Sequence, residues 1–161
     1  MPDEINEALR RMTILDPSLK KRIGGQTTPE AISNAEATLG IQLPDGFRLF
    51  LSRYGWGGPR GTEIYGVSDH LPQSEYPSLV EANEDAREWN CPQGLIVFAS
   101  AGDGGLYALA DARKNDDSVF VWYPGSRASF DELEISDDNF GSWLLRNIQD
   151  AIDLQQLQCC D

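Results

Sequence analysis

Carboxylates dominate the residues of this chain that could act as acids, bases, nucleophiles or metal ligands. The 161 residues include 26 Asp and Glu, three Cys and one His. His70 has no Cys or His neighbour at the spacing of a metal site, and Cys91 has no candidate base near it in the sequence. We therefore expect a protein that is not an enzyme and that holds neither a metal nor a cofactor.

Adjacent carboxylates could serve glycoside hydrolysis if a pair flanked a cleft. Examples of such pairs are Glu84-Asp85, Asp116-Asp117, Asp131-Glu132 and Asp137-Asp138. In a chain with this many acids such pairs arise by chance, and none lies in a loop with the alternating oxygen ligands of an EF-hand. We interpret them as surface charge.

The segment Gly102-Asp103-Gly104-Gly105 could form either a phosphate-binding loop or a β-turn. It lacks the lysine and the hydroxyl residue of a P-loop, and a strand rather than a helix is expected after it. Because Asp-Gly is a strong hairpin signal, we expect a turn between two strands, with Asp103 available to face a partner.

The charge is distributed unevenly along the chain. Residues 1–60 carry eight Lys and Arg against seven Asp and Glu, whereas residues 61–161 carry five against nineteen, and the net charge is −13. A negative field repels nucleic acid and anionic membranes and attracts basic proteins. The acidic residues could simply keep the protein soluble, or they could form a docking face for a basic protein.

The start of the chain, Met1-Pro2-Asp3-Glu4, is acidic where a secretory signal is basic, and no apolar run approaches the length of a membrane span. We interpret the three cysteines, including the adjacent Cys159 and Cys160, as reduced thiols. These features predict a cytoplasmic protein that does not bind membranes.

Helices are predicted in the first third of the chain and at its end. Residues 3–15 have helical amphipathic spacing, and residues 28–54 form a helical pair, in which Gly40 ends the first helix and Pro44 begins the second. In the second helix one apolar face is formed by Phe47, Phe50, Leu51 and Tyr54. Asn139 is expected to cap a final helix.

Between these helices the pattern favours strands joined by short turns. Strands are predicted at 63–67, 95–99, 106–111 and 119–123, with an edge strand at 129–135 and a short helix at 77–89. Short connections make neighbouring strands antiparallel. The predicted fold class is α+β: a single domain with a mainly antiparallel or mixed sheet of about five or six strands, packed with N-terminal helices and a C-terminal helix.

The stretch L-P-D-G-F-R-L-F-L-S-R-Y-G-W-G-G at 43–58 resembles the signature of the SUKH superfamily. Four further segments are similar to that family: I-Y-G-V at 64–67, G-D-G-G-L-Y-A-L-A-D at 102–111, V-F-V-W-Y at 119–123 and F-G-S-W-L-L at 140–145. The resemblance identifies residues 1–161 as one SUKH-like domain with its core at about 28–150, preceded by a helix and connector at 1–27 and followed by an acidic tail at 155–161.

The resemblance implies a function through protein binding. It implies an immunity protein that neutralises a cognate bacterial toxin. The acidic composition favours a basic, nucleic-acid-directed toxin, which would be occluded through an acidic surface. The alternative is a regulatory or scaffolding interaction module of the cell-wall assembly regulator type, as in eukaryotic relatives.

Aromatic anchors and carboxylates are the side chains suited to bind a basic partner, and the expected partner-binding residues are Trp56, Glu63, Tyr65, Asp69, Asp103, Asp116 and Asp117. Of these, Trp56, Glu63, Tyr65 and Asp69 are expected to be exposed.

Overall fold

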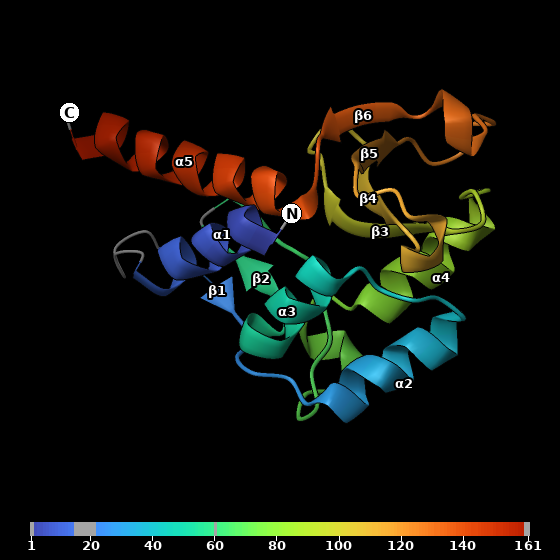
Figure 1. Cartoon of the computed structure of the whole chain (residues 1–161), viewed down its shortest axis with the longest axis horizontal. Helices are drawn as coiled ribbons and strands as arrows, with labels where there is room; N and C mark the ends of the chain where they lie inside the picture. The colour runs from blue at the N-terminus through green and yellow to red at the C-terminus, as the bar shows by residue number, and fades with distance from the viewer. Residues whose placement is uncertain (1, 15–21, 60, 160–161) are drawn as a thin grey trace.

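A four-stranded antiparallel sheet forms one side of the fold, at the upper right of Figure 1. The computed structural model describes residues 2–14, 22–59 and 61–159. Its strands follow one another in chain order: β3 Leu95–Ser100, β4 Leu106–Ala110, β5 Val119–Trp122 and β6 Glu134–Asp137. The strands predicted at 95–99, 106–111 and 119–123 are therefore confirmed, and the α+β fold class with them.

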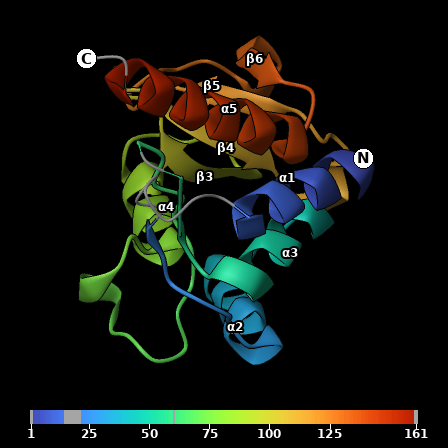
Figure 2. The same cartoon turned by 90° about the vertical axis from the view of Figure 1, so that its left-hand side faces the viewer.

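Helices cover the sheet and extend the fold beyond it (Figures 1 and 2). They are α1 Pro2–Ile14, α2 Pro29–Leu39, α3 Asp45–Tyr54, α4 Leu79–Glu88 and α5 Phe140–Cys159. α1 packs along α5, and α4 packs against β3. Short 3₁₀ turns lie at Gln73–Glu75, Ala112–Lys114 and Phe130–Glu132. Within the described ranges, no helix is both long enough and apolar enough to cross a bilayer.

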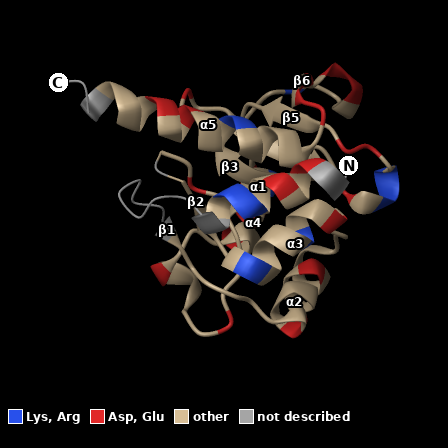
Figure 3. Ribbon diagram, turned by 60° about the vertical axis from the view of Figure 1, so that its left-hand side comes forward, with Lys and Arg blue, Asp and Glu red and all other residues tan. Residues whose placement is uncertain are grey.

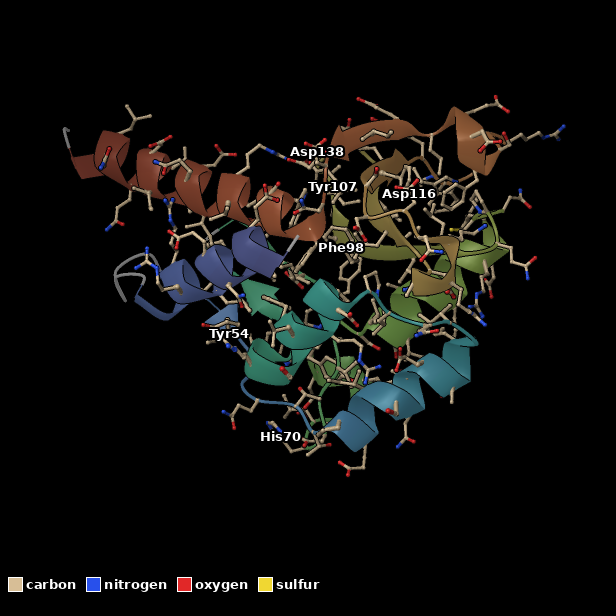
Figure 4. All side chains as sticks on the ribbon, viewed as in Figure 1. Tyr54, His70, Phe98, Tyr107, Asp116 and Asp138 are labelled. Atoms are coloured by element: carbon tan, nitrogen blue, oxygen red, sulfur yellow. The ribbon has the colours of Figure 1, made fainter. Side chains whose placement is uncertain are left out.

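The alternation of side chains along each strand divides the hydrophobic core in two. Phe98, Leu109 and Val119 belong to the main cluster with α1, α3 and α5, and Figure 4 shows Phe98 and Tyr107 near the start of α5. On the other face, Phe120 and Trp122 pack with Ala86 of α4. Phe120 and Trp122 are 3% and 1% exposed, and this second, smaller cluster forms the base of a surface groove.

Local signals explain the helical pair. The Thr28 hydroxyl accepts a hydrogen bond from the Ala31 N–H at 3.2 Å, and Pro29 fills the first helical position. α2 ends at Gly40, which adopts the left-handed conformation at φ 67°. α3 begins one residue after Pro44. Its four predicted apolar residues, Phe47, Phe50, Leu51 and Tyr54, are all buried.

The sheet differs from the prediction on its two outer sides. Residues 63–67 do not form a regular strand: Ile64 makes single antiparallel bridges to Gly57 and Ala99, while Gly66 makes a parallel one to Ser78. β2 Gly57–Gly58 instead pairs with β1 Arg22–Ile23. The edge strand predicted at 129–135 begins only at Glu134, because residues 130–132 form a 3₁₀ turn. The main sheet consequently has four strands.

The N-terminal helix is anchored to the final helix by a small polar cluster. The Asn139 side chain accepts a hydrogen bond from the Ser142 N–H at 2.8 Å, which confirms the predicted cap of α5. The Ser142 hydroxyl donates to the Glu4 carboxylate at 2.7 Å, and the Asn139 amide also donates to it. These two hydrogen bonds lower the pKa of Glu4. α5 continues to Cys159, so most of the predicted tail is helical.

A Glu4→Gln variant is expected to lose stability near neutral pH and to lose little in acid. The folded pKa of Glu4 is lowered, so its contribution is present above its unfolded value of about 4.3 and disappears as the pH falls through the folded pKa. Urea denaturation of the wild type and the variant would measure the difference in their free energies of unfolding, which is expected to be smaller in acid than at neutral pH. Glu84→Gln, an exposed change on α4, is the control. A pH-independent difference would contradict the role of the Glu4 charge.

Candidate partner-binding groove

A groove of about 440 Å³ lies between α4, the segment around Tyr65 and the end of β5. Tyr65 and Tyr76 line it, together with Ala82 and Ala86 of α4 and with Leu106 and Trp122 of the sheet. Trp122 is only 1% exposed. The groove therefore combines a buried apolar base from the second core cluster with walls contributed by distant parts of the chain.

Trp89 is the most exposed aromatic residue that lines this groove. It follows the last residue of α4, and 60% of it is exposed, which is unusual for so large an aromatic side chain. The Trp89 carbonyl accepts a hydrogen bond from the Gly125 N–H at 3.0 Å, which fixes the loop after β5 beside the helix end. Pro124 of that loop also lines the groove. Trp89 thus projects from a defined backbone position.

Trp56 does not line the groove but supports its wall. Trp56 is 6% exposed, so its predicted exposure is wrong. Its ring stacks on Tyr76, with centroids 6.2 Å apart and an interplanar angle of 24°. It also lies against the backbone of Gly24, where an added Cβ would come within 2.0 Å of the indole Nε1. The glycines around Trp56 let the backbones approach and bury the ring instead of presenting it to solvent.

The outer face of α4 is acidic. Four carboxylates recur at i, i+3, i+4 and i+7, which places them on one side of the helix, and all four are exposed: Glu81, Glu84, Asp85 and Glu88. Glu81 and Asp85 line the groove, and Glu63 lines it from the facing segment. Figure 3 shows that other Asp and Glu residues are spread over many elements of the fold. What distinguishes the groove is that its carboxylates lie beside aromatic side chains.

The pKa of Tyr65 responds to its surroundings in the groove. Burial raises the pKa of its phenol, and the negative charge of Glu63 raises it further. The phenol is therefore neutral at physiological pH and remains a hydrogen-bond donor. No ion pair among the described residues engages Glu63, Glu81 or Asp85. The groove is accordingly a place where a cation would find both carboxylates and ring faces.

The other predicted site residues lie elsewhere. Asp103, in the turn between β3 and β4, accepts a hydrogen bond from the Tyr123 hydroxyl at 2.8 Å. That bond lowers the pKa of Asp103 and raises the pKa of Tyr123. Asp116 and Asp117 line a separate hollow of about 520 Å³ with Asp45. They are a second candidate acidic surface, distinct from the groove.

Asp69 belongs to a third location. Its carboxylate lies 2.9 Å from Nδ1 of His70, a contact that lowers the pKa of Asp69. The neighbouring Ser68 hydroxyl accepts backbone N–H bonds from His70 and Leu71, so it stabilises the turn. Figure 4 shows His70 far from Asp116, at the opposite end of the view. The seven predicted residues thus do not form one surface, and only Glu63 and Tyr65 come together in the groove.

The prediction omitted Trp89, Tyr76, Glu81 and Asp85. The acidic spacing along residues 81–88 could be recognised from the sequence, and the helix predicted at 77–89 already ended at Trp89. The stacking of Tyr76 on Trp56 joins residues twenty positions apart through tertiary packing, for which the sequence carries no local signal.

Metal-ligating side chains are not clustered in the described part of the chain, and the Cys91 thiol is partly buried. No three His, Cys, Asp or Glu of that part of the chain gather where they could hold a metal ion. Burial raises the pKa of the Cys91 thiol to about 11, which disfavours the nucleophilic thiolate. Cys160 lies outside the described residues.

Comparisons with known proteins give the family. The family model of SUKH_5, described as SMI1-KNR4 cell-wall, matches residues 4–149. Among solved structures, a crystal structure of a protein from Pseudomonas syringae pv. tomato superposes with a TM-score of 0.60 at 19% identity, covering 89% of this chain and 94% of that chain, and so shares the fold. No curated protein matches. With nearly all of the chain matched, this protein belongs to the SUKH superfamily.

Proposed function

We propose that this protein is an immunity protein that neutralises a basic, nucleic-acid-directed toxin by binding it through the groove beside α4. It transforms no substrate. Family membership supports a protein-binding role, and the observation that carries the proposal is the groove itself, where Glu63, Glu81 and Asp85 surround aromatic side chains next to the exposed Trp89. Large aromatic residues and desolvated charge pairs dominate the energetics of protein interfaces.

Neutralisation follows from competition for the same charges. A toxin that acts on nucleic acid holds phosphate with Lys and Arg side chains, and carboxylates of this protein would occupy those side chains instead. The net charge of −13 would accelerate encounter with such a toxin. The association rate is therefore expected to fall as ionic strength rises, whereas the dissociation rate is expected to depend mainly on Trp89 and the buried contacts.

Charge reversal on α4 and its facing segment tests the proposal. The candidate toxin is the product of the gene next to this one, tested by co-expression for cell survival and by binding of the purified proteins. Glu63→Lys with Asp85→Lys is expected to weaken binding by about 100-fold or more, because like charges would face the basic surface of the toxin. Both residues are exposed, so the variant is expected to fold.

Two matched variants locate the contact. Glu84→Lys with Glu88→Lys makes the same change in net charge at two positions of α4 that do not line the groove, and it is expected to have a much smaller effect. Asp116→Lys with Asp117→Lys tests the second hollow. If all three double variants weakened binding equally, only net charge would matter and the groove would not be the contact. If none did, the electrostatic mechanism would be wrong.

A further inference from the structure

The groove beside α4 contains the components of a pocket for a single cationic side chain. Among the described residues that line it, the charged ones are Glu63, Glu81 and Asp85, all acidic. Its aromatic residues are Tyr65, Tyr76, Trp89 and Trp122. A volume of about 440 Å³ accommodates one long side chain and its immediate water, and it is small for a folded element such as a helix.

We propose that this groove binds an arginine side chain of the partner, with the guanidinium between the aromatic rings and the carboxylates of Glu63, Glu81 and Asp85. The inference rests on the proposed function in that the arginine comes from the toxin, and it adds which chemical group the groove recognises.

Arginine fits these surroundings better than lysine does. A guanidinium is planar, stacks on aromatic faces and donates in a fork that matches a carboxylate, and it is less strongly hydrated than an ammonium group. Trp89 offers an exposed ring of the type that gives the strongest cation–π contact. Glu81 and Asp85 are four residues apart on α4, so their carboxylates lie on the same side of the helix and can reach one cation together.

The pocket is held in shape by contacts that do not depend on a ligand. Trp56 stacks on Tyr76, and the Ser78 hydroxyl accepts from the Glu81 N–H at 3.2 Å at the start of α4. The carbonyl of Trp89 is bonded to the Gly125 N–H. Both the aromatic and the acidic walls are therefore positioned before binding, which lowers the entropic cost of accepting the cation.

An NMR titration with N-acetyl-arginine amide tests the inference without the toxin. The indole N–H signals of Trp89 and Trp122 are expected to shift in a saturable way, while the signal of Trp143, which is buried in the main cluster, stays in place. N-acetyl-citrulline amide has nearly the same shape without the charge and is expected to cause no saturable shift. N-acetyl-lysine amide is expected to bind more weakly than the arginine derivative.

Matched variants separate the groove from general attraction to an acidic protein. Asp85→Asn and Trp89→Ala are each expected to weaken arginine amide binding by about two- to fivefold. Glu84→Gln removes a neighbouring charge outside the groove and is expected to leave binding unchanged. Equal shifts with citrulline, tighter binding of lysine, or equal effects of Asp85→Asn and Glu84→Gln would each overturn the inference.

Failure of this inference is distinguishable from failure of the proposed function. If the protein protected cells from the toxin while arginine amide left Trp89 and Trp122 unmoved, the immunity role would stand and the arginine pocket would be wrong. If arginine amide bound as expected but the candidate toxin was neither bound nor neutralised, the pocket would stand and the choice of partner would be wrong.

Discussion

A Gly66→Ala variant is expected to be strongly destabilised. A Cβ at this position would lie 1.8 Å from the carbonyl oxygen of Gly55, 2.8 Å from its carbonyl carbon and 2.9 Å from the Cβ of Trp56. The first two are backbone atoms, which cannot move aside as a flexible side chain can. The segment carrying Trp56 would have to shift as a unit, and we expect a loss of about 3 kcal/mol or more.

The hydrogen bonds around Gly66 make such a shift costly. Gly66 N–H donates to the Pro77 carbonyl at 2.9 Å, and its own carbonyl accepts from the Leu79 N–H at 2.8 Å. The Val67 N–H donates to the Gly55 carbonyl at 2.9 Å. Moving Gly66 away from Gly55 would therefore disturb both the start of α4 and the segment that holds Trp56 against Tyr76. Because these segments form the walls of the groove, the variant is expected to lose the shape of the groove as well as stability.

Urea denaturation followed by tryptophan fluorescence would measure the change. Gly46→Ala provides the matched control, since an added Cβ there would meet only the Ile5 side chain, at 3.6 Å. Gly46 lies in α3, where alanine is the better helix former, so this variant is expected to be neutral or more stable by up to about 1 kcal/mol. If Gly66→Ala had the same urea midpoint of unfolding as the wild type, the close approach of the two backbone segments would be refuted.

Replacing Asn83 with leucine is expected to have the next largest effect. Asn83 is 4% exposed on α4, and its amide donates to the carbonyls of Leu79 at 2.9 Å and Val97 at 3.0 Å. Its side-chain oxygen accepts from the Val97 N–H at 2.9 Å. Leucine has a similar size but would leave both main-chain groups of Val97 buried without these bonds, at a cost of about 2–4 kcal/mol.

Two measurements would isolate this contact. The urea midpoint of Asn83→Leu would give the loss of stability, and hydrogen exchange would show faster exchange of the Val97 amide. Glu84→Leu places the same side chain one position later on the exposed face of α4, where we expect a change within about 0.5 kcal/mol. Equal stability of Asn83→Leu and wild type would show that α4 is not joined to β3 through this amide.

Features encoded by nearby residues were predictable from the sequence. Thr28, Gly40 and Asn139 mark helix ends through their own side chains or backbone freedom, and each occupies its predicted place. The short, continuous apolar runs likewise place β3, β4 and β5. These signals act over a few residues, so helix ends and strands can be predicted without knowing how distant parts of the chain pack together.

The groove was less predictable because it depends on contacts between distant residues. Residues 63–67 have the composition of a strand, but the approach of Gly66 to Gly55 directs their hydrogen bonds to three different neighbours. The same approach buries Trp56, which was predicted to be exposed. Composition identified Glu63 and Tyr65, whereas the wall facing them could be recognised only once α4 was placed beside the sheet.

The pairing of Asn83 with Val97 also limits how a partner can bind. On the side of β3 away from β4, the main chain of Val97 is occupied by Asn83, the Phe98 carbonyl accepts from the Tyr65 N–H at 2.7 Å, and Ala99 is bridged to Ile64. A guest polypeptide therefore finds this edge already filled and cannot extend the sheet there by β-augmentation. The same closure protects that edge against self-association into larger β-assemblies.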